Sequence, residues 1–226
     1  QMAEGIVRGI QNYLDKSFVF REIEQEAKKP GPPVLVKEGD IPFTDGFDYP
    51  VGAPDGRGYY VLKGFSSGFH VGEDWNGNGG GNTDEGDPVF AIGDGLVVLA
   101  GDQKKGWGNV IICRHRYLDK DGKEHMVDSV YAHLGSIEVK KGELVKRGQN
   151  IGTIGRGPHD MYAAHLHFEI RENTAIMMNR PDFAKSLRNY YSPRNFIKQH
   201  RNLKGKSFVN FEVKNIFDKA TLSTQK

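Results

Sequence analysis

The middle of the chain is built from short runs in which apolar and polar residues alternate. The run AAHLHFEIR, residues 163–171, is the clearest case, because every second residue from Ala164 to Ile170 is apolar. A period of two places alternate side chains on opposite faces of a β-strand. One face therefore carries Ala164, Leu166, Phe168 and Ile170, and the other carries His165, His167, Glu169 and Arg171. The two histidines project from the same face.

A second strand, in DSVYAHL at residues 128–134, carries another histidine. The same alternation predicts that Val130, Ala132 and Leu134 face inward and that Tyr131 and His133 lie on the polar face. PVFAIGDGLVVLAGD and WGNVIICRH supply neighbouring strands, and Gly, Pro, Asp or Asn ends most apolar runs. The expected fold is mainly β, an antiparallel sheet or sandwich with one face in the core and one polar face.

The two ends of the chain follow different patterns. Apolar residues at helical spacing between residues 6 and 18 predict an amphipathic N-terminal helix, which ends before the prolines at 30, 32 and 33. After residue 171 the sequence predicts one or two short helices. We therefore divide the chain into an N-terminal helix and Pro-rich connector at 1–42, a β domain at 43–200 and a C-terminal extension at 201–226.

Composition limits the classes of function. The 226 residues include 31 Lys and Arg against 29 Asp and Glu, a net charge of +2, which argues against a dedicated nucleic-acid binder. Cys113 is the only cysteine, so the chain has no internal disulfide and no cysteine-rich zinc knuckle. No stretch approaches the roughly 20 apolar residues of a membrane span. We expect no transmembrane segment, and we expect a monomer.

The stretch HVGEDW, residues 70–75, begins a candidate metal site. Catalytic zinc sites use three protein ligands drawn from His, Asp and Glu and leave a further position open. His70, Asp74 and one histidine of the H-L-H pair supply such a set. Residues four apart on a straight strand are separated by roughly 13 Å, too far for one ion. The chain must therefore bend, and Gly72 would permit the bend.

Two other motifs in this region predict different chemistry. From Asp74 the sequence also fits the calcium-loop pattern D-x-N-x-N-G, with Glu85 at its end. We reject it because glycines crowd the loop and strand-like sequence follows instead of a helix; a flexible surface loop is the better interpretation. GFSSG at 64–68 fits a serine-hydrolase pattern, but the sequence after it cannot form the helix that a nucleophile elbow needs.

Together the motifs resemble the lysostaphin or LytM-type zinc metallopeptidases, which cut peptidoglycan cross-bridges and have the duplicated hybrid motif fold. The matching pieces, in the family's order, are HVGED, DPVFAIGDGLVVLAG, GWGNVIICRH, VYAHL, KKGELVKRGQNIGTIGRG and HLHFEIR, within residues 65–171. The resemblance implies one zinc ion held by His70, Asp74 and His167. It also implies that His133 and His165 are catalytic histidines beside the metal, with the division of their roles left open.

Two insertions depart from the family's pattern and are expected to border the substrate groove. GRGPHDMYAAHLH adds residues before H-L-H and leaves His159 as a competing histidine, and the Gly-rich segment after Asp74 is long. The residues expected to contact substrate or to support the ligands are Tyr131, His159 and Glu169, although Glu169 could equally be a solvated charge. His115, His125 and His200 are expected to be structural or exposed.

The resemblance also implies a function. The expected activity is zinc-dependent hydrolysis of peptide cross-links in bacterial peptidoglycan, which places the protein in the cell envelope, in the periplasm or secreted. The alternative is a catalytically silent envelope scaffold or an activator of another wall hydrolase. Because all five expected site positions are filled, the sequence favours the enzyme.

Overall fold

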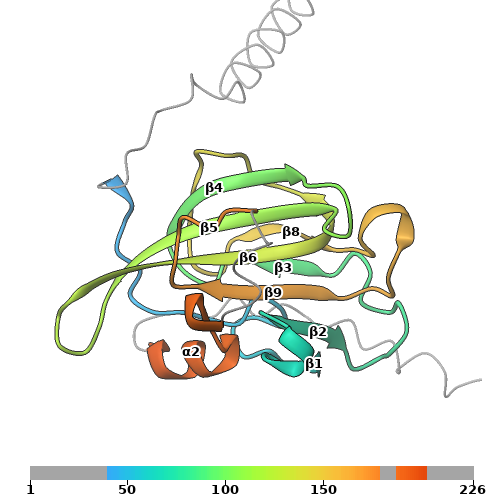
Figure 1. Ribbon diagram of the computed structural model, residues 1–226, viewed down its shortest axis with the longest axis horizontal. Helices are drawn as coiled ribbons and strands as arrows, with labels where there is room; N and C mark the ends of the chain where they lie inside the picture. The colour runs from blue at the N-terminus through green and yellow to red at the C-terminus, as the bar shows by residue number, and fades with distance from the viewer. Residues whose placement is uncertain (1–39, 179–186, 203–226) are drawn as a thin grey trace, which may run out of the picture. The chain divides into compact units, whose positions relative to one another are not determined.

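The computed structural model describes residues 40–178 and 187–202 (Figure 1). The predicted N-terminal helix, the connector up to residue 39 and the C-terminal extension from residue 203 lie outside the described residues, so the division of the chain into segments stays a prediction. The short helices expected after residue 171 are confirmed: η4 is Leu187–Asn189 and α2 is Pro193–His200. Two further 3-10 turns, η2 and η3, span Ser67–Phe69 and Pro158–Asp160.

Ten strands form one antiparallel sheet in the described part of the chain, which confirms the predicted fold class. In chain order they are β1 Tyr59–Lys63, β2 Glu73–Gly77, β3 Pro88–Phe90, β4 Gly95–Asp102, β5 Asn109–Leu118, β6 Glu124–Ile137, β7 Leu144–Val145, β8 Asn150–Ile154, β9 Leu166–Arg171 and β10 Tyr190–Tyr191. The main path of the sheet is β1-β2-β9-β6-β5-β4-β7, while β3, β8 and β10 pair from the side. Figure 1 shows β4, β5, β6 and β9 side by side, with β2 and β1 beyond β9.

The main core lies on one face of the long strands. Leu166, Phe168 and Ile170 of β9 are fully buried in it, as the alternation predicts. Each such side chain contributes about 1.5–3 kcal/mol when it leaves water, so the core holds β9 firmly. The histidines on the other face of β9 are fixed by the same packing.

The faces predicted for β6 are wrong for Val130, Tyr131 and Ala132, whereas Leu134 lies in the main core as predicted. Tyr131 pairs with Phe168 of β9, is fully buried in the main core, and accepts a hydrogen bond from the backbone N–H of Ile92. Val130 and Ala132 point to the opposite face, where a second apolar cluster buries them. The alternation of side chains does not reveal which face of β6 lies in the main core, because apolar residues cover both faces. Tyr131 therefore has no exposed surface with which to touch a substrate.

A β-bulge in β6 places His133. Tyr131 pairs with Ile111 of β5, but Leu134 pairs with Asn109, so β6 holds one more residue than β5 over this interval. His133 has φ +63°, a left-handed conformation that is uncommon for a residue with a side chain. The extra residue returns Leu134 to the core and lets His133 lie beside His167 of β9, with their ring centroids 5.7 Å apart. Bulges of this kind often redirect a side chain next to a functional site.

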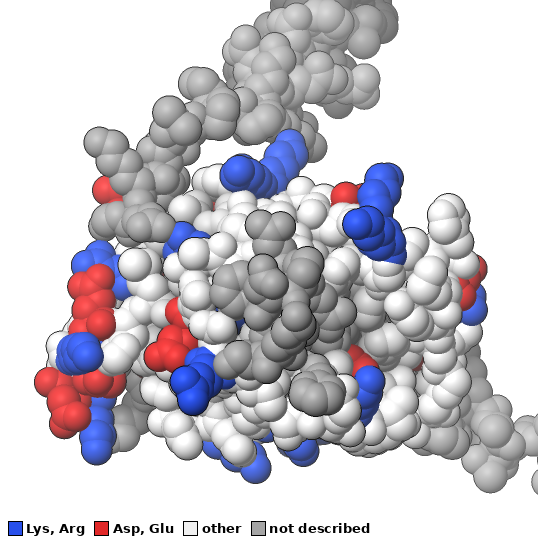
Figure 2. Space-filling model, in the orientation of Figure 1, with Lys and Arg blue, Asp and Glu red and all other residues white. Residues whose placement is uncertain are grey.

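Charges of both signs lie next to each other on the visible surface (Figure 2). Over the β5–β6 hairpin, Arg116 pairs with Glu124 at 2.6 Å and His125 with Asp119 at 2.8 Å. This mixture agrees with the small net charge of the chain. None of the helices in residues 40–178 and 187–202 combines the length and the apolar character needed to cross a membrane.

Candidate metal centre

Three side chains from distant parts of the chain meet on the polar face of the sheet. Asp74 of β2 is the direct cross-strand partner of His167 of β9, and His70 follows η2 just before β2 begins. Asp74 Oδ1 lies 2.9 Å from His167 Nδ1 and 3.2 Å from His70 Nε2, and the two histidine nitrogens are 3.1 Å apart. The set predicted as metal ligands therefore converges on a single point.

Gly72 allows this convergence through close packing. A Cβ on Gly72 would lie 2.5 Å from the carbonyl oxygen of Phe168 and 2.8 Å from Cγ of Glu169. The chain between His70 and Asp74 therefore lies directly against β9, where only glycine fits. The predicted proximity of His70 and Asp74 is correct, and its physical cause is contact with the neighbouring strand.

Hydrogen-bond partners indicate where the protons are. Nδ1 of His70 lies 3.2 Å from the carbonyl oxygen of Gly64, which can only accept, so this nitrogen donates. Nε2 of His167 lies 2.8 Å from a carboxylate oxygen of Glu169 and also donates. In the neutral rings, His70 Nε2 and His167 Nδ1 are then bare, and both face a carboxylate oxygen of Asp74. Three acceptors that point at one another repel unless a cation lies among them.

The distances between these three atoms fit a zinc ion. Tetrahedral zinc with bonds of about 2.0–2.1 Å separates its ligand atoms by about 3.3 Å. The observed separations of 2.9, 3.1 and 3.2 Å are close to that value. Two imidazoles and one carboxylate are also a donor set that zinc uses at catalytic sites.

The pKa values of the cluster indicate that it favours positive charge. Burial alone would raise the pKa of Asp74, but the close contacts with the imidazoles of His167 and His70 hold it well below its usual value. Burial alone would lower the pKa of His167, but its close contacts with the carboxylates of Asp74 and Glu169 raise it. Both shifts act in the direction that stabilises a cation at this point.

A buried ion pair supports His167 from behind. Glu169 is completely buried, accepts from His167 Nε2, and accepts from Arg171 Nε at 2.7 Å. Burial alone would raise the pKa of Glu169, but the charge of Arg171 and the hydrogen bond from His167 lower it to about 2. Glu169 is therefore ionised at neutral pH. A carboxylate behind a ligating histidine fixes the ring orientation and increases its basicity.

His133 and His165 lie next to the cluster. The ring centroids of the two are 4.8 Å apart, and His165 Nε2 lies 3.9 Å from Asp74 Oδ1. Nδ1 of His133 donates to the carbonyl oxygen of Trp107 at 3.2 Å, and Nδ1 of His165 donates to that of Ala163 at 2.8 Å. Both neutral rings therefore keep an unprotonated Nε2. Burial, together with His167 and His165, lowers the pKa of His133 to about 3.

Two asparagines connect the Gly-rich loop to the segment before β9. Asn76 Nδ2 donates to the carbonyl oxygen of Ala164 at 3.1 Å, and the N–H of Ala164 donates to Asn82 Oδ1 at 2.9 Å. Asp84 accepts from the N–H of Gly77 at 2.8 Å. The expected flexible loop is thus a series of turns with defined anchors. The segment proposed to start a calcium loop lies in β2, and its Asp74 side chain contacts the two histidines instead.

The other histidines lie apart from the cluster. His115 is fully buried, where Nδ1 donates to the carbonyl oxygen of Asp94 at 2.9 Å, and His200 stacks on Phe196. His125 pairs with Asp119 on the hairpin. These positions agree with the structural or exposed roles expected from the sequence. His159 is exposed in η3, and its contact with substrate stays a prediction.

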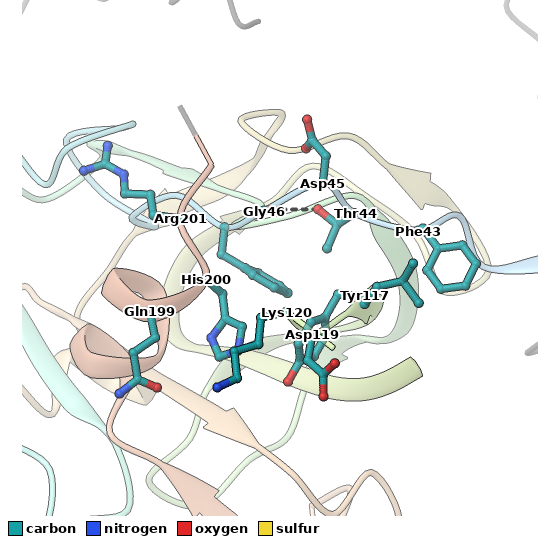
Figure 3. Close-up of a pocket in the computed structure, with 12 residues that line it drawn as sticks. Phe43, Thr44, Asp45, Gly46, Tyr117, Asp119, Lys120, Gln199, His200 and Arg201 are labelled. Atoms are coloured by element: carbon teal, nitrogen blue, oxygen red, sulfur yellow. Dashed lines mark hydrogen bonds between the residues drawn. The ribbon is translucent and has the colours of Figure 1, made fainter. Parts of the chain in front are cut away.

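A cavity of about 510 Å³ lies elsewhere, between the segment before β1, the end of β5 and the end of α2 (Figure 3). The ligand cluster does not line it. Figure 3 shows Arg201 and Asp45 directed away from its centre. Arg201 pairs with Asp48 and Asp55, and Asp45 pairs with Arg147. The converging side chains identify the functional site better than the size of this cavity.

Comparison with known proteins agrees with the geometry. The sequence model of peptidase family M23 matches residues 68–178. Lipoprotein NlpD of Yersinia enterocolitica is 40% identical over 88 residues, which are 38% of this chain and 78% of that protein. The chain belongs to peptidase family M23. The matched residues include the whole candidate metal centre, and the resemblance to lysostaphin-type peptidases is confirmed.

Two other relatives of this M23 chain are much longer than the match. Peptidoglycan DD-endopeptidase ShyB of Vibrio cholerae is 36% identical over 42% of this chain, which spans 19% of that protein. Murein hydrolase activator NlpD of Escherichia coli strain K12 is 38% identical over 38% of this chain, which spans 20% of that protein. Lysostaphin from Staphylococcus simulans is a similar solved structure, 30% identical, covering 69% of this chain and 55% of that one, with a TM-score of 0.45.

Sequence reasoning missed two aromatic residues at this M23 site. Trp107 and Tyr162 both contact His133, with ring centroids 6.5 and 4.7 Å from it. Trp107 also contacts His167 at 5.6 Å, edge to face. The only sequence signal was their position: Trp107 comes directly before β5, and Tyr162 lies in the insertion before H-L-H.

Proposed function

We propose that the protein is a zinc-dependent endopeptidase that hydrolyses peptide cross-links of bacterial peptidoglycan. The observation that carries the proposal is the convergence of one potential ligand atom from each of His70, Asp74 and His167, all within 4.8 Å of one another, beside two further histidines. A zinc ion held there supplies Lewis-acid chemistry, polarising the scissile carbonyl and lowering the pKa of water toward about 7. The names of the relatives point to peptidoglycan as the substrate and to the cell envelope as the location.

The chain's own residues supply the proton transfers. His133 and His165 each use Nδ1–H for a backbone carbonyl, so each leaves Nε2 unprotonated, and that of His165 lies 3.9 Å from Asp74 Oδ1. One of the two histidines orients or deprotonates the water, and the other stabilises the oxyanion or protonates the leaving amine. The low pKa of His133 keeps it neutral across physiological pH. Glu169 holds the third ligand, His167, in the tautomer that leaves Nδ1 free.

The backbone at His133 supports the enzyme over a silent scaffold. A non-glycine residue at φ +63° costs about 1–3 kcal/mol, and such strain gathers at sites where it serves a function. A protein that only binds the cell wall has no need to hold a histidine in that conformation. The activator function, suggested by the name of one relative, remains the second candidate.

Purified protein incubated with peptidoglycan tests the proposal. Release of soluble peptides should stop when a chelator is added and return with zinc. His133→Ala and His165→Ala should each lose most turnover and still bind one zinc, while His125→Ala, on the far hairpin, should remain active. Mass spectrometry of the new termini identifies the bond that is cut.

Two outcomes oppose the proposal. Cleavage that is insensitive to the chelator, or full activity of both histidine variants, would contradict the assigned roles. A protein that releases nothing itself but increases the activity of a second wall hydrolase would favour the activator.

A further inference from the structure

Tyr162 lies in the loop that precedes β9, residues 156–163, which departs from the family's sequence pattern. Its half-buried ring lies against both proposed catalytic histidines, with centroids 4.7 Å from His133 and 5.7 Å from His165. Trp107 stacks on His133 with ring centroids 6.5 Å apart at an interplanar angle of 24°. The imidazole of His133 therefore contacts two aromatic rings. Offset and edge-to-face contacts between such rings are favourable beyond the area that they bury.

Two glycines make room for this tyrosine. A Cβ on Gly157 would lie 2.7 Å from Cδ2 of Tyr162, and a Cβ on Gly106 would lie 2.8 Å from its hydroxyl oxygen. The two glycines belong to different loops, before β5 and before β9. Both loops therefore lack a side chain next to Tyr162. Because of this gap, the ring of Tyr162 can reach the histidines.

The 156–163 loop is closed on itself in a way that fixes Tyr162. The N–H of Tyr162 donates to the carbonyl oxygen of Arg156 at 3.0 Å, and Nε of Arg156 donates to the carbonyl oxygen of Tyr162 at 3.3 Å. Between them, His159 and Asp160 have φ +53° and +55°, two consecutive left-handed residues that carry side chains. A left-handed residue that carries a side chain is strained and needs a surrounding structure that sustains it. The turn brings Tyr162 back over the site.

From these contacts we infer that Tyr162 is a positioning residue, whose ring, together with Trp107, holds the imidazoles of His133 and His165 in the orientation that the reaction requires. The inference rests on the proposed peptidase function. It assigns the action to the ring, because the hydroxyl oxygen is directed toward Gly106. A displacement of about 1 Å in a reacting group lowers a rate by roughly a hundredfold.

Kinetics of two substitutions test the ring. Tyr162→Ala should lower kcat on a peptidoglycan peptide by roughly a hundredfold with little change in KM, at unchanged zinc content and with the protein still folded at the assay temperature. Tyr162→Phe keeps the ring and should retain nearly the full kcat. If Tyr162→Phe is impaired as much as Tyr162→Ala, the hydroxyl is the active part and the inference is wrong.

Gly106 supplies a matched test that leaves Tyr162 in place. Gly106→Ala should push the hydroxyl of Tyr162 away and lower kcat, because the new Cβ would lie 2.8 Å from that oxygen. When Gly106→Ala is combined with Tyr162→Phe, the new Cβ meets no hydroxyl, so Gly106→Ala should lower kcat much less in this background. Equal losses in both backgrounds would mean that Gly106 does not act through Tyr162, and would overturn the inference.

NMR of the histidine rings separates this inference from the proposed function. In protein labelled at histidine, Tyr162→Ala should shift the imidazole signals of His133 and His165, with or without zinc, while the distant His115 stays unchanged as an internal reference. Unshifted signals together with a full kcat would refute the positioning role. If the wild-type protein cleaves no peptidoglycan, the proposed function fails, and the ring signals still decide whether Tyr162 orients the histidines.

Discussion

Replacing Glu169 by glutamine should weaken zinc binding through the histidine that Glu169 supports. The carboxylate accepts from His167 Nε2 at 2.8 Å and from Arg171 Nε at 2.7 Å, and the pair is buried. Glutamine keeps an acceptor oxygen but removes the negative charge, so His167 becomes less basic and the charge of Arg171 is no longer balanced. Loss of such a supporting carboxylate lowers metal affinity by about 10–100-fold, or about 1.4–2.7 kcal/mol.

A control is needed because the same substitution also leaves a buried arginine without its carboxylate. Breaking a buried pair costs about 3–5 kcal/mol of folding stability, so Glu169→Gln should lower the melting temperature as well. Asp128→Asn is the matched variant, because Asp128 is equally buried and pairs with Arg114 at 2.9 Å on the neighbouring strand. It should lose comparable stability and keep its affinity for zinc.

Competition with a chromophoric chelator measures the affinity of each purified variant for zinc, and thermal melts without metal measure stability. The expected result is a zinc dissociation constant raised at least tenfold for Glu169→Gln and unchanged for Asp128→Asn. Wild-type affinity in Glu169→Gln would refute the role of the carboxylate. Equal loss of affinity in both variants would assign the effect to general destabilisation of the fold.

Two further predictions concern residues around the site. Burial lowers the pKa of His115 to about 4, below the usual value of about 6.5, so the neutral ring stabilises the fold above pH 6.5 and this contribution is lost as pH falls toward 4. Between pH 7.5 and 5, urea melts should show that the free energy of unfolding falls by about 2 kcal/mol more in the wild-type protein than in His115→Gln. Equal losses in the two proteins would contradict the pKa shift of His115. Gly72→Ala should lower the free energy of unfolding by about 1–3 kcal/mol and weaken zinc binding in the chelator assay, because the new Cβ would meet the backbone of Phe168. Gly64→Ala places its Cβ in open space and should change neither property. Wild-type stability and zinc affinity in Gly72→Ala would contradict the close packing.

The strand β9 shows what local pattern can predict. Its alternation is complete over residues 164–171, one face is fully apolar, and the structure has that face in the core. The positions of His165 and His167 on the other face followed directly. The candidate ligands His70 and Asp74 could be predicted from the sequence together with the bend between them, because residues four apart can reach one ion only if the chain bends.

The strand β6 shows where local pattern fails. Its outer face is covered by a second apolar cluster, so hydrophobicity does not distinguish inside from outside, and Tyr131 was placed on the wrong face. The bulge that directs His133 depends on its register with β5, which is a property of two strands together. Tyr162 was missed for a related reason: its contacts are made across a loop whose conformation depends on left-handed residues and on a glycine in another segment.

The bonds from Asn76 and Asn82 to Ala164 have a consequence for protein engineering. They link the two segments expected to be insertions, one after Asp74 and one before His165, across 82 to 88 positions of sequence. A chimera that takes only one of these loops from a homologue would leave the main-chain amide or carbonyl of residue 164 without its partner. A chimera with a relative is therefore expected to keep these hydrogen bonds only if both loops are exchanged as a unit.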